Sequence, residues 1–234
     1  MADQWRGGLH SEAKARYDGS IFLQKTIHMA GKFMLGTKGK MTQVFDEKGV
    51  VSAATIVSAG PMTVTQVKGK EKDGYDAVQL GTGTRAAKNL GKAVVGHLKD
   101  LPNARFIREN RQEAGEMKRG DTIDLSIFVP GDVVEVSAIS KGKGFQGVVK
   151  RHGFSGGPRS HGQKNKERAP GSIGGGGRAG GRVVKGMRMG GRMGGDRVTV
   201  SNLRVLQVDV ANNQILISGA VPGRPGTLVE IRTK

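Results

Sequence analysis

The sequence predicts a mainly β protein: an antiparallel β-barrel domain with a long irregular extension, rich in Gly, Lys and Arg, inserted between two of its strands. Three observations predict this class. Short β-branched runs recur between turn signals on both sides of residue 140. The runs on either side are too few to close a sheet alone. Residues 140–197 hold 19 of the 39 glycines and only two aromatic residues, so they have little to bury.

The strand pattern that precedes the extension begins at Phe33. Apolar and β-branched runs alternate with the turn signals Asp46–Gly49, Ala59–Pro61 and Glu71–Gly74. A looser stretch follows, in which we expect one short helix within residues 88–99. The expected strands cover residues 33–35, 41–45, 50–57, 63–67, 75–80, 122–128 and 133–139.

The strand pattern resumes after the extension, at residues 197–200, 203–210, 214–218 and 228–231, with Asn212-Asn213 as a hairpin turn. We therefore expect one barrel built from residues 29–139 and 197–234 and interrupted by an extension over residues 140–196. Loops beyond about 12–15 residues without a core of their own are usually functional or disordered. Residues 1–28 form a weakly patterned tail that we expect to be loosely ordered, and Met29 is an alternative start.

Positive charge is concentrated in the same extension. Residues 140–197 carry 14 Lys or Arg and two acids, a net of +12 out of +18 for the chain. Ordering each residue costs about 1–2 kcal/mol of backbone entropy, which a segment without a core cannot recover by burial. We expect a polyanion to neutralise and order it, which indicates nucleic acid. An amphipathic membrane-binding helix is disfavoured because each interior glycine costs about 1 kcal/mol relative to alanine.

Composition disfavours several other classes of protein. The chain has no cysteine, its five histidines show no metal-ligand spacing, and no apolar run approaches a membrane span. The N-terminus lacks the order of charges and apolar residues that marks a signal peptide. We therefore expect a cytoplasmic protein with no metal, cofactor or small-molecule substrate.

Two glycine-rich motifs resemble nucleotide loops but lack the required context. Gly142–Val149 matches G-x-G-x-x-G-x-V, yet no acid follows at the dinucleotide spacing, and neither His-Arg-Asp nor Asp-Phe-Gly occurs in the chain. Gly31–Lys38 ends in Gly-Thr-Lys where a Walker loop requires Gly-Lys-Ser/Thr. An enzyme reading would rest on the first loop alone, and we expect no catalytic residue.

The extension instead has the residues of RNA recognition. Arginine bridges phosphates and stacks on bases, and lysine acts as a point charge. Histidine can stack on a base or contact a phosphate. Phe145 and Phe154 could equally stack on bases or anchor the extension, and we expect Glu167 and Asp196 to pair with arginine. Without a recognition helix, folded RNA is favoured over duplex DNA, although a nucleoid-type DNA binder stays open. The candidate RNA-binding residues are Lys141, Lys143, Phe145, Lys150, Arg151, His152, Arg159, His161, Lys164, Lys166, Arg168, Arg178, Arg182, Lys185, Arg188 and Arg192.

Seven ordered blocks between residues 32 and 234 resemble the universal ribosomal protein L3 family, in its bacterial form. The blocks are Leu35–Lys38 with Met41–Phe45, Asp73–Gly81, Ser140–Arg151, Gly156–Gly162, Arg168–Gly174, Lys185–Gly194 and Gly219–Gly223. Residues 1–28 lie outside the resemblance.

The resemblance implies a structural, non-catalytic protein of the large ribosomal subunit. It implies a barrel on the subunit surface, an arm that threads ribosomal RNA toward the peptidyl-transferase centre with its tip near Phe145–Arg168, a role in early assembly, and neighbouring ribosomal proteins as partners. Three departures bear on the arm: Gly175 stands where some relatives carry a methylated glutamine, Glu167 stands where relatives commonly have histidine, and Arg178–Gly181 is one residue longer than the usual spacing.

Overall fold

Six strands of the chain pair in sequence-distant order to form a closed antiparallel barrel. The computed structural model describes residues 31–113, 115, 117–174 and 180–233, and it confirms the mainly β prediction. Around the barrel the order is β1-β12-β7-β10-β11-β2. These strands are β1 (Phe33–Phe45), β2 (Val51–Ser58), β7 (Val133–Ile139), β10 (Arg197–Asp209), β11 (Gln214–Ser218) and β12 (Leu228–Thr233). Three of them precede residue 140 and three follow it, so neither half closes the barrel alone.

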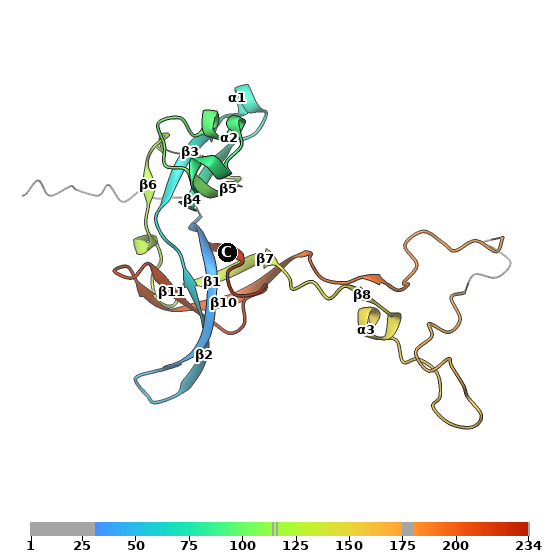
Figure 1. Cartoon of the computed structure of the whole chain (residues 1–234). Helices are drawn as coiled ribbons and strands as arrows, with labels where there is room; N and C mark the ends of the chain where they lie inside the picture. Colours follow the sequence, from blue (N-terminus) through green and yellow to red (C-terminus); the bar gives the residue numbers. More distant parts are fainter. Residues whose placement is uncertain (1–30, 114, 116, 175–179, 234) are drawn as a thin grey trace, which may run out of the picture.

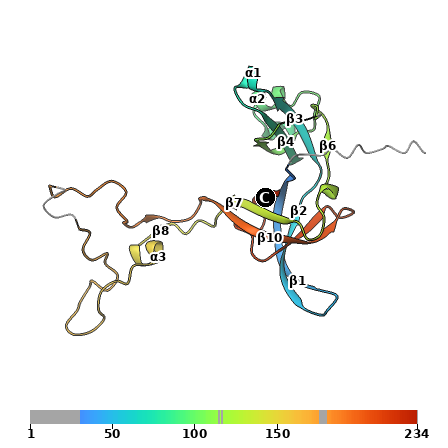
Figure 2. The same ribbon diagram turned by 180° about the vertical axis from the view of Figure 1, so that it is seen from behind.

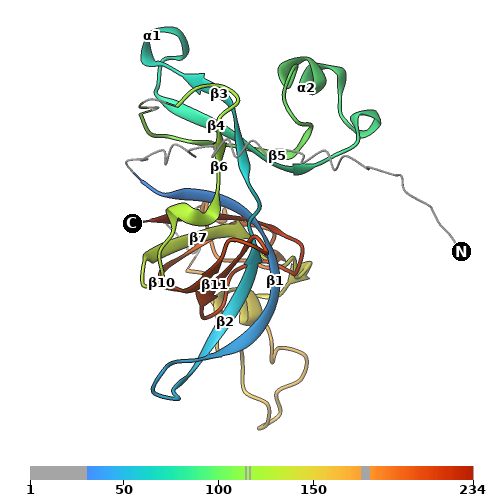
Figure 3. The ribbon, with the colours of Figure 1, turned by 90° about the vertical axis from the view of Figure 1, so that its left-hand side faces the viewer.

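A second antiparallel sheet stands at one end of the barrel (Figures 1 and 3). Its order is β5-β4-β3-β6, with β3 (Met62–Lys68), β4 (Ala77–Thr84), β5 (Ala104–Asn110) and β6 (Thr122–Ile123). Short helical turns connect its strands, namely α1 (Lys70–Asp73), η1 (Ala87–Asn89) and α2 (Lys92–His97), and a fourth, η2 (Leu125–Ile127), leads from β6 to β7 of the barrel. The sequence pattern did not separate this sheet from the barrel.

One continuous hydrophobic core joins the two sheets. Phe33, Leu35 and Ile231 from the barrel are fully buried in the same cluster as Val64 and Leu80 from the second sheet. Burying such side chains contributes roughly 1.5–3 kcal/mol each. The barrel and the second sheet therefore form one folded body, residues 31–139 and 197–233, which we call the body.

Ion pairs also connect the two sheets of the body. Glu230 on β12 accepts hydrogen bonds from Arg108 on β5, at 3.2 Å, and from Arg197 on β10, at 2.5 Å. Its side chain is only 14% exposed, so these bonds lie partly out of water. This three-residue cluster fixes β5 against the barrel.

Two strands are longer than predicted because each continues through a bulge. The ladder between β1 and β2 shifts register between Lys38 and Met41, and that between β10 and β7 between Val200 and Leu203. Asn202 takes a φ of +59° in the second bulge, a conformation that asparagine tolerates better than most residues. Residues 33–45 and 197–209 are thus single strands rather than two strands each.

One other prediction for the body is wrong. The expected strand over residues 122–128 ends at Ile123, and a 3₁₀ turn follows. Leu125 and Phe128 are both buried, and their spacing of three residues is that of a 3₁₀ turn. The expected turn at Glu71–Gly74 is present, as the single helical turn α1, which ends at Asp73 and is capped by Gly74 with φ +80°. Strand β5 was not predicted.

Candidate nucleic-acid interface

The segment between β7 and β10 leaves the barrel and extends far beyond the body (Figures 1 and 2). We call residues 140–196 the arm. Its regular elements are the short strands β8 (Phe145–Gln146) and β9 (Gly191–Arg192) and the short helix α3 (Val148–His152). Gly175–Gly177, Arg178 and Ala179 lie outside the described residues, as do residues 1–30 with the predicted tail and Met29, so the Gly175 departure and the candidate Arg178 are not placed.

The base of the arm is a narrow antiparallel ladder. The amide of Ser140 donates to the carbonyl of Asp196 at 2.8 Å, and β8 pairs with β9. The amide of Lys143 donates to the carbonyl of Met193 at 2.9 Å. Gly194 has a φ of +74°, and a Cβ there would collide with the carbonyl oxygen of Lys141. Glycine is therefore required where the outgoing and returning segments of the arm come closest.

Helix α3 is held against the returning chain by two basic side chains. Arg151 Nη1 donates to the carbonyl oxygen of Met189 at 2.9 Å, and His152 Nε2 lies 3.0 Å from the same oxygen. A carbonyl only accepts, so His152 carries a proton on Nε2. Val148 on α3 is buried. We call the contacts of Arg151 and His152 with the Met189 carbonyl the clamp.

The arm beyond α3 folds back on itself in a loop. The amide of Gly157 donates to the carbonyl of Glu167 at 2.8 Å, and Arg159 Nε lies 2.8 Å from Glu167 Oε1. The expected pairing of Glu167 with an arginine is thus confirmed. For Asp196, the contacts shown are those of its backbone with Ser140.

The candidate RNA-binding residues are almost all exposed. Arg151 and His152 are half-buried because they form the clamp, and every other described candidate is exposed. In the described part of the arm, the one ion pair is Arg159–Glu167. The remaining exposed cations therefore present their charge to solvent. They are Lys141, Lys143, Lys150, Lys164, Lys166, Arg168, Arg182, Lys185, Arg188 and Arg192.

The two phenylalanines of the arm differ in exposure. Phe145 is 78% exposed, which leaves its ring free to stack on a base. Phe154 is half-buried, and its ring centroid lies 6.0 Å from that of His152. The alternatives that the sequence left open thus divide between them: Phe145 is available to a ligand, and Phe154 packs within the arm.

A lysine of the body that the sequence did not single out lies where the arm begins. Lys38 Nζ donates to the carbonyls of Val221 and Gly223, at 2.6 and 2.9 Å. Partial burial and the nearby positive charge of Lys141 lower the pKa of Lys38. The base of the arm therefore has a positive field that begins on the barrel itself.

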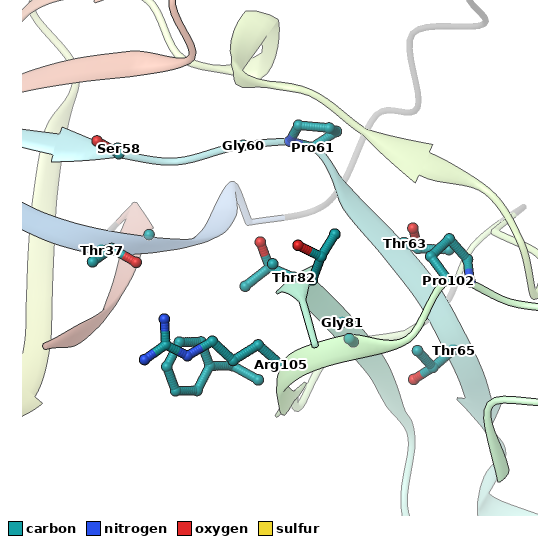
Figure 4. Close-up of a pocket in the computed structure, with 15 residues that line it drawn as sticks. Thr37, Ser58, Gly60, Pro61, Thr63, Thr65, Gly81, Thr82, Pro102 and Arg105 are labelled. Atoms are coloured by element: carbon teal, nitrogen blue, oxygen red, sulfur yellow. The ribbon is translucent and has the colours of Figure 1, made fainter. Parts of the chain in front are cut away.

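A cavity of about 460 Å³ lies between the barrel and the second sheet (Figure 4). Glycine, serine, threonine and proline form most of its lining, and Arg105 is the charged residue among them. The guanidinium of Arg105 lies 4.9 Å from the centroid of the Phe106 ring. This lining brings together no acid, base and nucleophile, so it differs from a catalytic site.

The glycine-rich motif Gly142–Val149 does not form a nucleotide loop. Its strand β8 has two residues and pairs antiparallel with β9, whereas a dinucleotide loop follows a parallel strand of a βαβ unit. Among the described residues, no group of His, Asp and Glu is placed to hold a metal ion. No helix in the described part of the chain is long and apolar enough to cross a membrane.

Comparisons with known proteins agree with the resemblance in sequence. A family model described as Ribosomal protein L3 matches residues 113–214. The large ribosomal subunit protein uL3 of Herpetosiphon aurantiacus is 49% identical over 200 residues, which cover 85% of this chain and 94% of the relative. The uL3 proteins of Acidothermus cellulolyticus and Chlorobium phaeobacteroides are 49% and 44% identical, over 86% and 85% of this chain and 92% and 96% of their own. The chain belongs to the ribosomal protein L3 family and is a structural, non-enzymatic component of the large ribosomal subunit.

Proposed function

We propose that the arm binds large-subunit ribosomal RNA while the body anchors the protein in the subunit. The observation that carries this proposal is the row of exposed cations along a segment with almost no core of its own. Phosphates supply the counter-charge that the arm lacks, and their neutralisation releases condensed counterions. The binding residues are the exposed basic side chains of the arm together with Phe145.

The shape of the arm favours folded RNA over duplex DNA. Helix α3 has five residues, whereas major-groove readers present a longer recognition helix. The rest of the arm is irregular and narrow, which suits passage between RNA helices and contact with unpaired bases. A DNA-binding function would require comparable affinity for duplex DNA.

Membership of the family supports two further parts of this proposal, namely where the arm reaches and when it binds RNA. The arm extends away from the body (Figure 1), and we propose that it reaches toward the peptidyl-transferase centre. We further propose that binding occurs early in subunit assembly, when the RNA channel around the arm is still open. Neighbouring ribosomal proteins would then contact the body.

The test is the salt dependence of binding between the full chain and large-subunit ribosomal RNA. Lys164, Lys166 and Arg168 are exposed in the loop of the arm. Changing all three to alanine should reduce the slope of log K against log salt by about 1 for each lost phosphate contact, so by up to about 3.

The matched control removes the same charge from the body. Lys48, Lys70 and Lys72 are exposed there, and their triple alanine variant should leave the slope close to that of the parent chain. Equal losses in both variants, or an unchanged slope in the arm variant, would refute the assignment of RNA contacts to the arm.

A further inference from the structure

The hairpin of β1 and β2 is a second protrusion from the barrel, separate from the arm (Figures 1 and 2). Its turn is closed by the amide of Asp46, which donates to the carbonyl of Val50 at 3.0 Å, and by the amide of Gly49, which donates to the carbonyl of Asp46 at 2.8 Å. Gly49 has a φ of +76°. We call residues 40–53 the hairpin.

One face of the hairpin is mainly apolar and is exposed to solvent. Phe45 pairs with Val51 and Gln43 with Ala53 in the ladder, and residues that stand opposite each other share a face. Met41 lies two residues before Gln43 and so shares that face. Met41, Phe45 and Val51 are 53%, 66% and 52% exposed, and Gln43 and Ala53 are also exposed. None of the five side chains carries a charge.

Both edges of the hairpin lack partner strands within the described residues. The pairing of β12 with β1 ends at Thr37, and that of β11 with β2 ends at Ala54. Beyond Ala54, the carbonyl of Ala53 accepts one more bond, from the amide of Gly219 at 2.8 Å. Native proteins cover or charge exposed apolar strand edges because these invite association. The uncovered face and edges therefore indicate a docking surface.

The charge of the hairpin distinguishes its occupant from that of the arm. Lys40 and Lys48 are balanced by Asp46 and Glu47, so the hairpin lacks the excess of cations that binding to RNA phosphates requires. Removal of apolar surface from water drives association between proteins instead. The turn at the tip holds Asp46, Glu47 and Lys48, and its net negative charge favours a partner whose apolar patch has a basic rim.

We propose that the hairpin docks onto another protein of the large ribosomal subunit, through an apolar patch bordered by lysine or arginine on that partner. Phe45, paired with Val51 next to the turn, is the anchor of this contact, and Met41 extends the same face toward the barrel. The proposal rests on the family of the chain and on the hairpin, and it does not depend on the arm binding RNA.

The first test places a photoreactive benzoylphenylalanine at Phe45 of the full chain, in cells where it is the sole copy. Purified large subunits are irradiated, treated with ribonuclease and digested for mass spectrometry. A covalent product with a second large-subunit protein is expected. Cross-linking to RNA, cross-linking to residues 1–30 of the same chain, or no product would each overturn the proposal.

The second test measures the energetic role of the face. Phe45→Asp should lower the occupancy of the cross-linked neighbour in subunits by about tenfold, as expected for the loss of an aromatic anchor. Val210→Asp is the control, because Val210 is 50% exposed on the body outside the hairpin. Equal occupancy in the two variants would refute the proposal. Unchanged salt-dependent RNA binding by Phe45→Asp keeps this test separate from that of the arm.

Discussion

The body and the arm of this protein are stabilised by different means. The body buries a continuous core that includes Phe33, Leu35 and Ile231, whereas Val148 is the buried apolar residue in the described part of the arm. The arm is shaped instead by backbone ladders, the clamp and glycines with positive φ. Burial of apolar side chains stabilises the body, whereas most of the described arm is exposed to solvent.

The same contrast holds for charge. In the body, Lys32 pairs with Asp132, Lys68 with Glu109, and two arginines share Glu230. In the described arm, Arg159–Glu167 is the one ion pair. Several charges of the body are thus neutralised within the chain, whereas most cations of the described arm have no ion-pair partner among the described residues. The variants below test how cleanly the two regions divide these tasks.

The largest expected effect comes from a substitution that creates a cavity in the hydrophobic core of the body. Ile231 is fully buried in the core, so Ile231→Ala should lower the free energy of unfolding by about 2–5 kcal/mol in urea titrations. Phe145→Ala in the arm removes a larger side chain but should change this free energy by less than about 0.5 kcal/mol. Comparable losses in the two variants would show that the arm contributes to global stability.

A smaller and local effect is expected at the base of the arm. Gly194→Ala forces a Cβ against the carbonyl of Lys141 and strains a φ of +74°, which should favour local opening by at least the roughly 1–2 kcal/mol of the left-handed conformation. Hydrogen exchange of the Lys143 amide should accelerate accordingly.

Gly186→Ala is the control for that experiment, because Gly186 has a φ of +86° but nothing within 4 Å of its Cβ position. It carries the strain without the collision. If both variants accelerate hydrogen exchange of the Lys143 amide equally, the close approach of the outgoing and returning segments does not hold the base of the arm together.

The sequence predicted those parts of the fold that depend on local pattern. Strands β7 and β11 have the bounds that alternation gave them, residues 133–139 and 214–218. Strand β5 was missed because its charged residues read as a loop. Its Arg108 is satisfied by Glu230, 122 residues away, and its Glu109 by Lys68. Partners so distant in sequence leave no local signal.

The candidate site likewise has a part that the sequence predicted and a part that it did not. Composition and charge singled out the basic side chains of the arm, and every described candidate except Arg151 and His152 is exposed. The clamp was not predicted, since its acceptor is the backbone carbonyl of Met189, 38 residues from Arg151. Every residue has a carbonyl, so the sequence does not mark this one.

The clamp allows a finer comparison between shaping the arm and binding with it. Arg151→Ala removes one hydrogen bond to Met189 and should loosen the arm locally by about 1 kcal/mol, detected as faster hydrogen exchange of the Arg151 and Gly153 amides at the end of α3. Lys150→Ala, on the exposed side of the same helix, should leave this exchange unchanged and reduce the salt slope of RNA binding by about 1. Identical behaviour of the two variants would contradict separate roles.

The smallest effect concerns the paired charges of the body. The hydrogen bond from Lys68 is the main cause that lowers the pKa of Glu109, and the same bond raises the pKa of Lys68. Tyr75 also donates to Glu109, at 2.8 Å. Because the folded pKa of Glu109 is depressed, its ionised form stabilises the body above its unfolded pKa of about 4.3, and this contribution is lost as pH falls through the folded value.

Lys68 has the opposite sign, because its folded pKa is raised. Its contribution is present below its unfolded pKa of about 10.4 and is lost as pH rises through the folded value. Glu109→Gln should therefore flatten the decline of unfolding free energy on the acid side, with a modest loss near neutral pH, since the Glu109 side chain is 30% exposed and such pairs are screened. Curves for variant and parent that stay parallel from pH 7 to pH 3 would show that Glu109 does not couple folding to pH. The Lys68–Glu109 ion pair would then contribute nothing measurable to the stability of the body. Body and arm would differ in stability only because the body buries apolar side chains.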